Sequence, residues 1–140
     1  MIPTQTTLFT ETIEVVTKQY FAASRSSSKV ESMVACFAED CLVQDPAEAP
    51  ALHGHAELGQ FFQSIVDLFS TLELMEEFIS INGNEVAVKW RGHGIGKNGC
   101  KVSFEGIDLF EFNSNGKIQR LRGYWNPAAM LDKLLNPAQE

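Results

Sequence analysis

The chain has 140 residues, of which 44% are hydrophobic, a length and composition typical of one globular domain with a full core. Eleven lysines and arginines stand against 18 aspartates and glutamates, giving a net charge of −7. Because the basic residues are also scattered, nucleic-acid or anionic-membrane binding is not expected. No apolar stretch approaches the roughly 18 residues of a membrane span, and the N-terminus has no basic segment followed by an apolar run. We therefore expect a single domain over residues 1–140 in a soluble, cytoplasmic protein.

The three cysteines, Cys36, Cys41 and Cys100, have no CxxC spacing and are odd in number. A disulfide framework or a zinc site is therefore not expected, and reduced structural cysteines are. His93 lacks partners at metal-ligand spacing, so the sequence predicts no metal.

The first third of the chain has helical periodicity. Over residues 7–24 the apolar residues recur at helical spacing and predict an amphipathic helix, with Tyr20 on its buried side. Ser28, followed three residues later by Glu31, has the form of a capping box and predicts a second helix. The inner face of that helix is expected to comprise Met33, Val34 and Phe37.

A short strand, a loop and a third helix are expected next. Residues 41–45 form a strand that ends at Pro46, because the residue before a proline is disfavoured in the helical region. A loop over 46–54 leads to a helix over about 56–68. The residues expected to be buried by this helix are Leu58, Phe61, Phe62, Ile65, Val66 and Phe69.

The second half reads as an antiparallel meander, because turn signals rich in asparagine and glycine separate its segments. The predicted strands are about 72–81, 85–96, 101–112 and 117–125, followed by a short closing helix after Pro127. Helices followed by an antiparallel sheet indicate an α+β fold. We expect the curved sheet to wrap around the N-terminal helices as a cone with an apolar pocket.

The last hairpin fixes which residues share a face of the sheet. With Asn115 and Gly116 as the two loop residues, Phe112 is expected to face Gln119 and Asp108 to face Gly123. The face that carries Asp108 is otherwise apolar and holds Phe104, Phe110, Phe112, Leu121 and Trp125. A carboxylate among such side chains is either paired or protonated through a raised pKa.

The preceding turn leaves two registers open. A strict two-residue loop at Asn98-Gly99 would place Lys89 and Arg91 beside Asp108, and a guanidinium there would hold the carboxylate ionised. A bulge in this region would instead turn Val88 and Trp90 inward. We favour the bulge because it buries the apolar residues of the strand.

Tyr20 on the first helix, the strand end at 43–46, and residues 106–110 and 123–125 together resemble ketosteroid isomerase. That enzyme is a member of the nuclear-transport-factor-2-like, SnoaL-like superfamily. The similarity covers nearly the whole chain in order and spacing. It implies the cone fold, no cofactor, and a homodimer formed through the convex face of the sheet.

The resemblance also implies roles for three residues. Asp45 would be the general base that removes a proton next to a carbonyl, while Tyr20 and a protonated Asp108 would donate hydrogen bonds to the resulting enolate oxygen. A hydrophobic, steroid-like or polyketide-like small molecule would be the ligand. The predicted pocket walls are Phe37, Phe62, Phe104, Phe110, Leu121 and Trp125. Two of these, Phe37 and Phe62, stand where the isomerases have tyrosines that support the catalytic one.

The residues by themselves leave other interpretations open. Asp45 could cap the turn at Pro46, Tyr20 could be a core tyrosine, and Asp108 could pair with Arg91 or Lys89. Three functions are therefore considered. The chain is a cofactor-independent isomerase or cyclase, a non-catalytic binding protein for a hydrophobic small molecule, or an interaction module that uses its sheet face.

Overall fold

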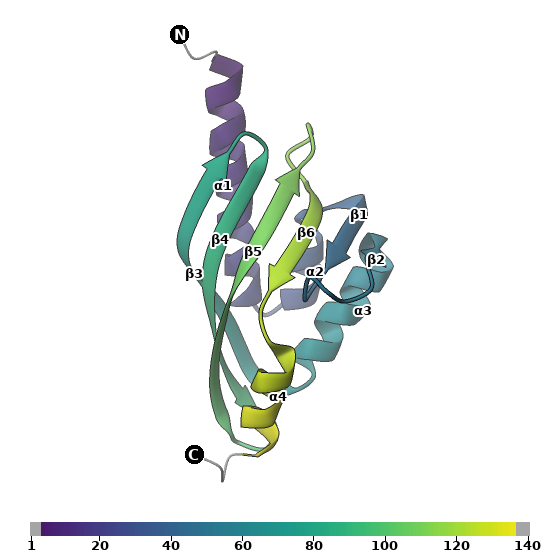
Figure 1. The fold of residues 1–140 in the computed structure, drawn as a ribbon, viewed down its shortest axis with the longest axis vertical. Helices are drawn as coiled ribbons and strands as arrows, with labels where there is room; N and C mark the ends of the chain where they lie inside the picture. The colour runs from purple at the N-terminus through teal and green to yellow at the C-terminus, as the bar shows by residue number, and fades with distance from the viewer. Residues whose placement is uncertain (1–3, 137–140) are drawn as a thin grey trace.

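The computed structural model describes residues 4–136 and has the expected α+β architecture (Figure 1). The helices are α1 (Thr4–Ser24), α2 (Lys29–Val34), α3 (Gly54–Val66) and α4 (Pro127–Leu135). The strands are β1 (Phe37–Gln44), β2 (Leu52–His53), β3 (Phe69–Asn82), β4 (Glu85–Gly96), β5 (Lys101–Phe112) and β6 (Ile118–Tyr124). Within the described residues, no helix is both long and apolar enough to cross a membrane.

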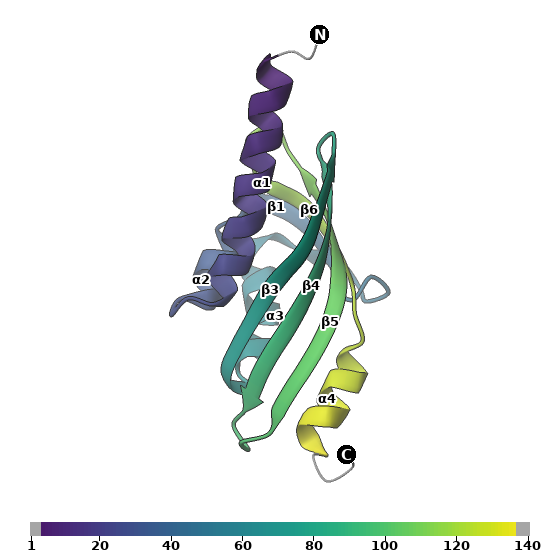
Figure 2. The ribbon, with the colours of Figure 1, turned by 90° about the vertical axis from the view of Figure 1, so that its left-hand side faces the viewer.

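All six strands form one sheet in the order β2-β1-β6-β5-β4-β3. From β3 to β6 the sheet is the predicted antiparallel meander. By contrast, β1 joins the edge of β6 in parallel. The sheet curves, and α1, α2 and α3 lie on its concave side, with α1 running along β3 (Figures 1 and 2). The parallel pair has a direct consequence for the site, because it brings the end of β1 beside the end of β6.

The turn between β4 and β5 has three loop residues, not two. Gly96 N donates to Cys100 O at 2.8 Å, and Gly99 takes a φ of +83°, a value that glycine adopts without strain. The extra residue shifts the register by one, so Val88 lies opposite Asp108. The favoured register is therefore confirmed, with Val88 and Trp90 buried.

The hairpin between β5 and β6 has the predicted register along most of its length, including the pair of Asp108 with Gly123. The prediction fails near the loop, where Phe112 pairs with Ile118 and not with Gln119. The Asn113 side chain accepts hydrogen bonds from Asn115 N and Lys117 N, which makes the loop longer than two residues. Local side-chain bonding of this kind competes with the strand ladder.

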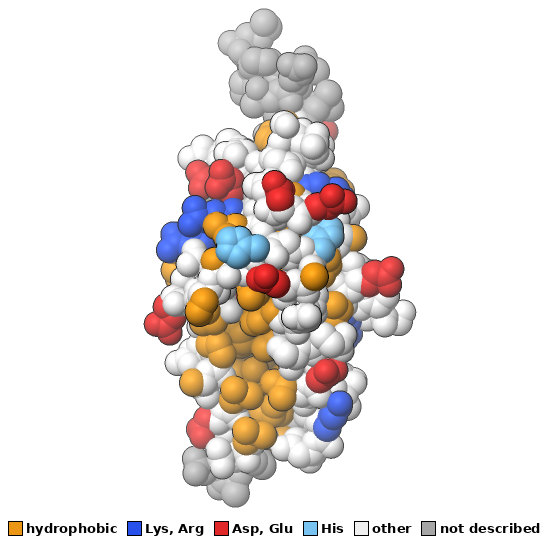
Figure 3. Space-filling view, turned by 90° about the vertical axis from the view of Figure 1, so that its right-hand side faces the viewer, with side chains coloured by type: hydrophobic (Ala, Val, Ile, Leu, Met, Phe, Trp, Pro, Cys, Tyr) orange, Lys and Arg blue, Asp and Glu red, His pale blue; other side chains and the backbone are white. Residues whose placement is uncertain are grey.

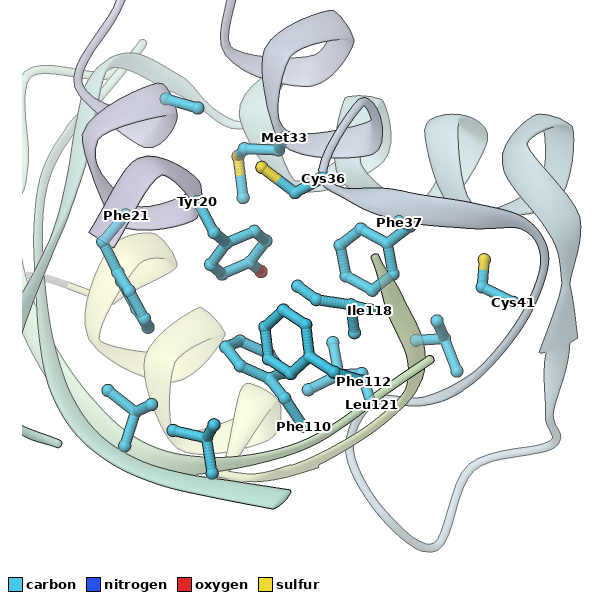
Figure 4. Close-up of a cluster of buried hydrophobic side chains, with 14 of the residues drawn as sticks. Tyr20, Phe21, Met33, Cys36, Phe37, Cys41, Phe110, Phe112, Ile118 and Leu121 are labelled. Atoms are coloured by element: carbon cyan, nitrogen blue, oxygen red, sulfur yellow. The ribbon is translucent and has the colours of Figure 1, made fainter. Parts of the chain in front are cut away.

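The main core lies between the concave face and the helices, where aromatic rings from α1, β1 and β5 pack together (Figure 4). Some predicted boundaries are wrong. Phe37 begins β1 and does not lie on α2, and Phe69 begins β3 and does not lie on α3. The capping box does not form, because Ser28 Oγ lies 2.8 Å from Ser32 Oγ and makes no cap bond.

A second, smaller core closes the other end of the sheet. There α4 packs against β5, and Met130 and Leu134 are buried with Phe69 and Val102. On β4 a side chain at Gly96 would overlap Leu134, so the absence of a Cβ makes room for the helix. The predicted closing helix thus covers the end of the sheet that the other helices leave open.

Candidate active site

The three residues expected to carry the chemistry come from three elements. Tyr20 belongs to the buried stripe of α1, which recurs at helical spacing with Ile13, Thr17 and Phe21. Asp45 directly follows β1, and Asp108 lies in the middle of β5 on the concave face. All three line one cavity.

Gly123 on β6 is the point at which the two carboxyl groups meet. A Cβ atom at this glycine would overlap Asp45 Oδ1 and would lie 3.3 Å from Asp108 Oδ1. Asp108 reaches it because the two residues are paired across the ladder, and Asp45 reaches it because β1 runs parallel to β6. The chain after Asp45 is held there by a bond of 2.7 Å from Ala47 N to Gly123 O. Glycine is therefore required at this position for both carboxyl groups to occupy the same corner.

Asp45 accepts a hydrogen bond of 2.6 Å from the indole Nε1 of Trp125. This is the one hydrogen bond of its carboxylate among the described residues, so the turn-cap interpretation is not supported. Burial raises the pKa of Asp45 from 3.8 to about 6, and the bond from Trp125 partly opposes the rise. Near neutral pH the carboxylate is therefore mostly ionised but only weakly stabilised, as a general base requires.

Asp108 is 4% exposed and sits deeper than Asp45. Burial, and then the charge of Asp45, raise the pKa of Asp108 well above its usual range. The nearby indole N–H of Trp90 opposes this, although Trp90 Nε1 has no hydrogen-bond partner of good geometry in the described part of the chain. Two neighbouring carboxyl groups with different burial separate in pKa, and here Asp108 keeps the proton.

The salt-bridge interpretation of Asp108 is wrong. Lys89 and Arg91 lie on the opposite, convex face, where both pair with Glu77 and Glu105. The register at the β4–β5 turn decides this, because one residue of shift moves every side chain of a strand to the other face.

Tyr20 is 2% exposed, and no hydrogen bond among the described residues involves its hydroxyl group. Burial raises the pKa of Tyr20 well above 10, and negative charge on Asp108 and Asp45 adds to this effect. Its ring packs edge-on against Phe37 at 5.8 Å between centroids and against Phe110 at 5.3 Å. With phenylalanine at 37 and 62, packing alone positions the hydroxyl, and it has a hydrogen to donate.

The cavity has a volume of about 60 Å³, within about 590 Å³ of atom-free space that includes the open mouth. Of the predicted walls, Phe62, Phe104 and Trp125 line it. Phe37, Phe110 and Leu121 do not, and this part of the prediction is corrected. They share the concave face but lie in the core around Tyr20, where α1 covers the sheet (Figure 4).

Several lining residues were not predicted from the sequence. They are Ser24, Lys29, Met33, Phe61, Ile65, Val66, Leu72, Leu74 and Trp90. Phe61, Ile65 and Trp125 are only half-buried, and hydrophobic side chains gather on the side of the molecule that carries α3 and α4 (Figure 3). A helical or strand pattern identifies such residues as buried, but it does not separate pocket lining from core.

No group of three or more His, Cys, Asp or Glu side chains in the described ranges is arranged to hold a metal ion. His93 lies on the convex face, where Nδ1 is 3.0 Å from Ser103 Oγ.

A sequence profile for the SnoaL-like domain matches residues 17–121, which is most of the chain. The chain belongs to the SnoaL-like family. This family is part of the nuclear-transport-factor-2-like superfamily, so the resemblance noted from the sequence is confirmed.

Solved structures of this fold include enzymes. The epoxide hydrolase/cyclase-like enzyme SalBIII, which acts in pyran ring formation in the polyether salinomycin, is 22% identical, with a TM-score of 0.74 over 84% of this chain and 93% of its own. A Δ5-3-ketosteroid isomerase from Mycobacterium sp. is 22% identical, with a TM-score of 0.69 over 82% and 93%.

A Mycobacterium tuberculosis protein in complex with estradiol-17β-hemisuccinate is 21% identical, with a TM-score of 0.72 over 85% of this chain and 96% of that one. At these identities the likeness shows the fold, and the activity has to be argued from the site.

Proposed function

We propose that this SnoaL-like protein is a cofactor-independent isomerase or cyclase that removes a proton next to a carbonyl group of a hydrophobic small molecule. The observation that carries the proposal is the pair of neighbouring carboxyl groups with different pKa values. Asp45, with a pKa of about 6, is ionised at neutral pH, whereas the pKa of Asp108 is raised well above its usual range. One cavity then offers a proton acceptor and a proton donor.

The proposed reaction uses the two groups and Tyr20 in distinct roles. Ionised Asp45 takes a proton from the carbon beside the carbonyl. The electron pair of the broken C–H bond forms a carbon–carbon double bond, and the π electrons of the carbonyl move to its oxygen. Tyr20 and protonated Asp108 donate hydrogen bonds to that oxygen as its negative charge develops. Asp45 then returns the proton to another carbon of the dienolate, which gives an isomer. Alternatively, the enolate carbon attacks a second carbonyl of the same molecule, and the alkoxide so formed takes the proton from Asp45, which gives a cyclised product and restores the base.

The surroundings of the site support an apolar, flat ligand. Phe62, Phe104, Trp90 and Trp125 line the cavity, and the rings of Phe104 and Trp125 lie 5.7 Å apart at a tilt of 32°. Aromatic walls of this kind suit polycyclic compounds. The solved ketosteroid isomerase, the cyclase-like enzyme and the complex with a steroid ester share the fold that builds the cavity.

The first test is isomerisation of a β,γ-unsaturated ketosteroid, followed by ultraviolet absorbance of the conjugated product. Turnover should disappear in Asp45→Asn, which loses the base. It should fall by about 10²–10³-fold in Asp108→Leu, which loses one donor to the oxyanion. Asp40→Asn is the matched control, because Asp40 is an exposed aspartate on β1, the strand that Asp45 follows, and its loss should leave turnover unchanged.

A wild-type protein that binds the steroid without turnover would favour the second function, a binding protein that holds a hydrophobic ligand in the same cavity. The phenylalanines at 37 and 62, which give Tyr20 no hydrogen bond, are the observation that favours this alternative. Equal turnover by wild type and Asp45→Asn would contradict the proposed base.

A further inference from the structure

One wall of the cavity, where α1 ends and α2 begins, includes a lysine. Lys29 opens α2, is half-buried, and lines the cavity together with Ser24 and Leu74. The other charged residues in the lining are the two aspartates already described. Lys29 is thus the one basic side chain among the residues that line this cavity.

The ammonium group of Lys29 makes fewer hydrogen bonds than it can donate. It donates one hydrogen bond, of 3.1 Å, to the carbonyl oxygen of Ser26. Within the described ranges no carboxylate lies within 4.0 Å of it, although a lysine can donate three hydrogen bonds. Arg25, four residues earlier, is by contrast paired with Glu76. A half-buried lysine that lines an apolar cavity and has no carboxylate partner is suited to receive an anionic ligand group.

Lys29 also stands where the cavity meets the surface. Lys29 and Val66 line an open surface depression as well as the cavity itself. Glu31 is the acidic residue of that depression, and it is exposed. A charged ligand group held at Lys29 would therefore remain partly hydrated, which keeps the cost of binding it low.

The lining of the cavity extends across the sheet from the edge strand β3, which carries Leu72 and Leu74, to Asp45 beside the inner strand β6. Ser24, which lines the cavity together with Lys29, accepts a hydrogen bond of 3.0 Å from Leu74 N on β3, whereas Asp45 lies against Gly123 on β6. Strands β5 and β4 lie between β3 and β6, so three strand spacings, about 14 Å measured along the sheet, separate the strands that Ser24 and Asp45 contact. The lining between them includes Trp90 and Phe104.

We propose that the natural ligand is an elongated apolar molecule with an anionic group, such as a carboxylate, at the end away from Asp45, and that Lys29 selects it. The inference rests on the proposed function for the position of the reacting end only. It specifies the substrate class, which the carboxyl pair does not.

Binding can be measured without turnover, because both tryptophans of the chain, Trp90 and Trp125, line the cavity. The probes are 4-(pyren-1-yl)butanoic acid and its primary amide, which differ in charge and share the apolar body. Quenching of tryptophan emission at pH 8 and low ionic strength gives the Kd of each. Wild type should bind the acid about fivefold more tightly than the amide, and added salt should reduce this ratio.

Lys29→Met should lower the ratio to one or below, because the net charge of −7 and the ionised Asp45 then disfavour the anion. Lys29→Arg should keep the preference. Lys97→Met is the matched control, since Lys97 is exposed in the β4–β5 turn and the substitution changes the charge equally. Circular dichroism checks that each variant is folded.

The inference is overturned if wild type does not prefer the acid, if neither probe binds, or if Lys29→Met keeps the preference. These outcomes are separate from the failure of the proposed function. A protein that prefers the acid through Lys29 but shows no turnover would refute the enzyme proposal alone. A protein that isomerises the ketosteroid but binds acid and amide equally would refute the role of Lys29 alone.

Discussion

Replacing Asp45 by asparagine should stabilise the protein at neutral pH and have little effect in acid. Burial raises the pKa of Asp45 from 3.8 to about 6. Between these two pH values, the folded state therefore holds a proton that the unfolded chain has already released. The wild-type protein therefore loses stability as pH rises through this window. At about 1.36 kcal/mol per pH unit, the loss is at most about 3 kcal/mol, and most of it arises between pH 4 and pH 7.

Asparagine removes the charge and keeps an oxygen that can accept the bond from Trp125 Nε1, which makes it the conservative substitution. Urea unfolding of both proteins at several pH values gives the difference in unfolding free energy. That difference should grow by about 2–3 kcal/mol in favour of Asp45→Asn between pH 4 and pH 8. The exposed Asp40→Asn serves as the control and should show no such trend. A constant difference, or one that favours the wild type at high pH, would refute the reasoning.

Three further predictions concern the neighbours of this carboxylate and the opposite face of the sheet. Gly123→Ala should lower turnover more than tenfold with the backbone intact, because its methyl group would displace Asp45; unchanged kinetics would contradict the contact. Trp125→Phe should move the acid limb of the pH–rate profile above about 6, since it removes the hydrogen bond that lowers the pKa of Asp45, and an unmoved limb would count against that bond. We also predict a homodimer through the convex face, where Ile107 and Phe78 are 44% and 66% exposed; Ile107→Asp should give a monomer in light scattering, and a monomeric wild type would refute the interface.

The sequence predicts the sheet well because turn chemistry and strand alternation are local. The pairing of Asp108 with Gly123 is predicted by placing the hairpin loop at Asn115-Gly116. The burial of Trp90 is predicted by choosing the register that buries Val88. The capping box at Ser28 was wrong for the opposite reason. A match of two residues three positions apart is weak evidence, and the Ser28 hydroxyl group instead lies 2.8 Å from that of Ser32.

The meeting of Asp45 with Asp108 could be stated from the sequence only through resemblance. It depends on β1 lying parallel to β6, a contact between residues about 80 positions apart for which the chain carries no local signal. The prediction of the pocket walls was only partly correct, for a related reason. Phe37 and Phe104 are both apolar residues that face the concave side, and only the position of α1 decides which of them is covered.

The two buried carboxyl groups lower the stability of the fold, which indicates that they are kept for a function. A buried carboxylate with no cationic partner destabilises a fold, and apolar residues of similar size in its place would not. Here two such groups lie against one glycine, and Lys89 and Arg91, which could neutralise them, are on the other face. If the pair were structural, Asp45→Asn would lower stability. A variant that gains stability at neutral pH while losing turnover would be expected only if the carboxylate is kept for its chemistry.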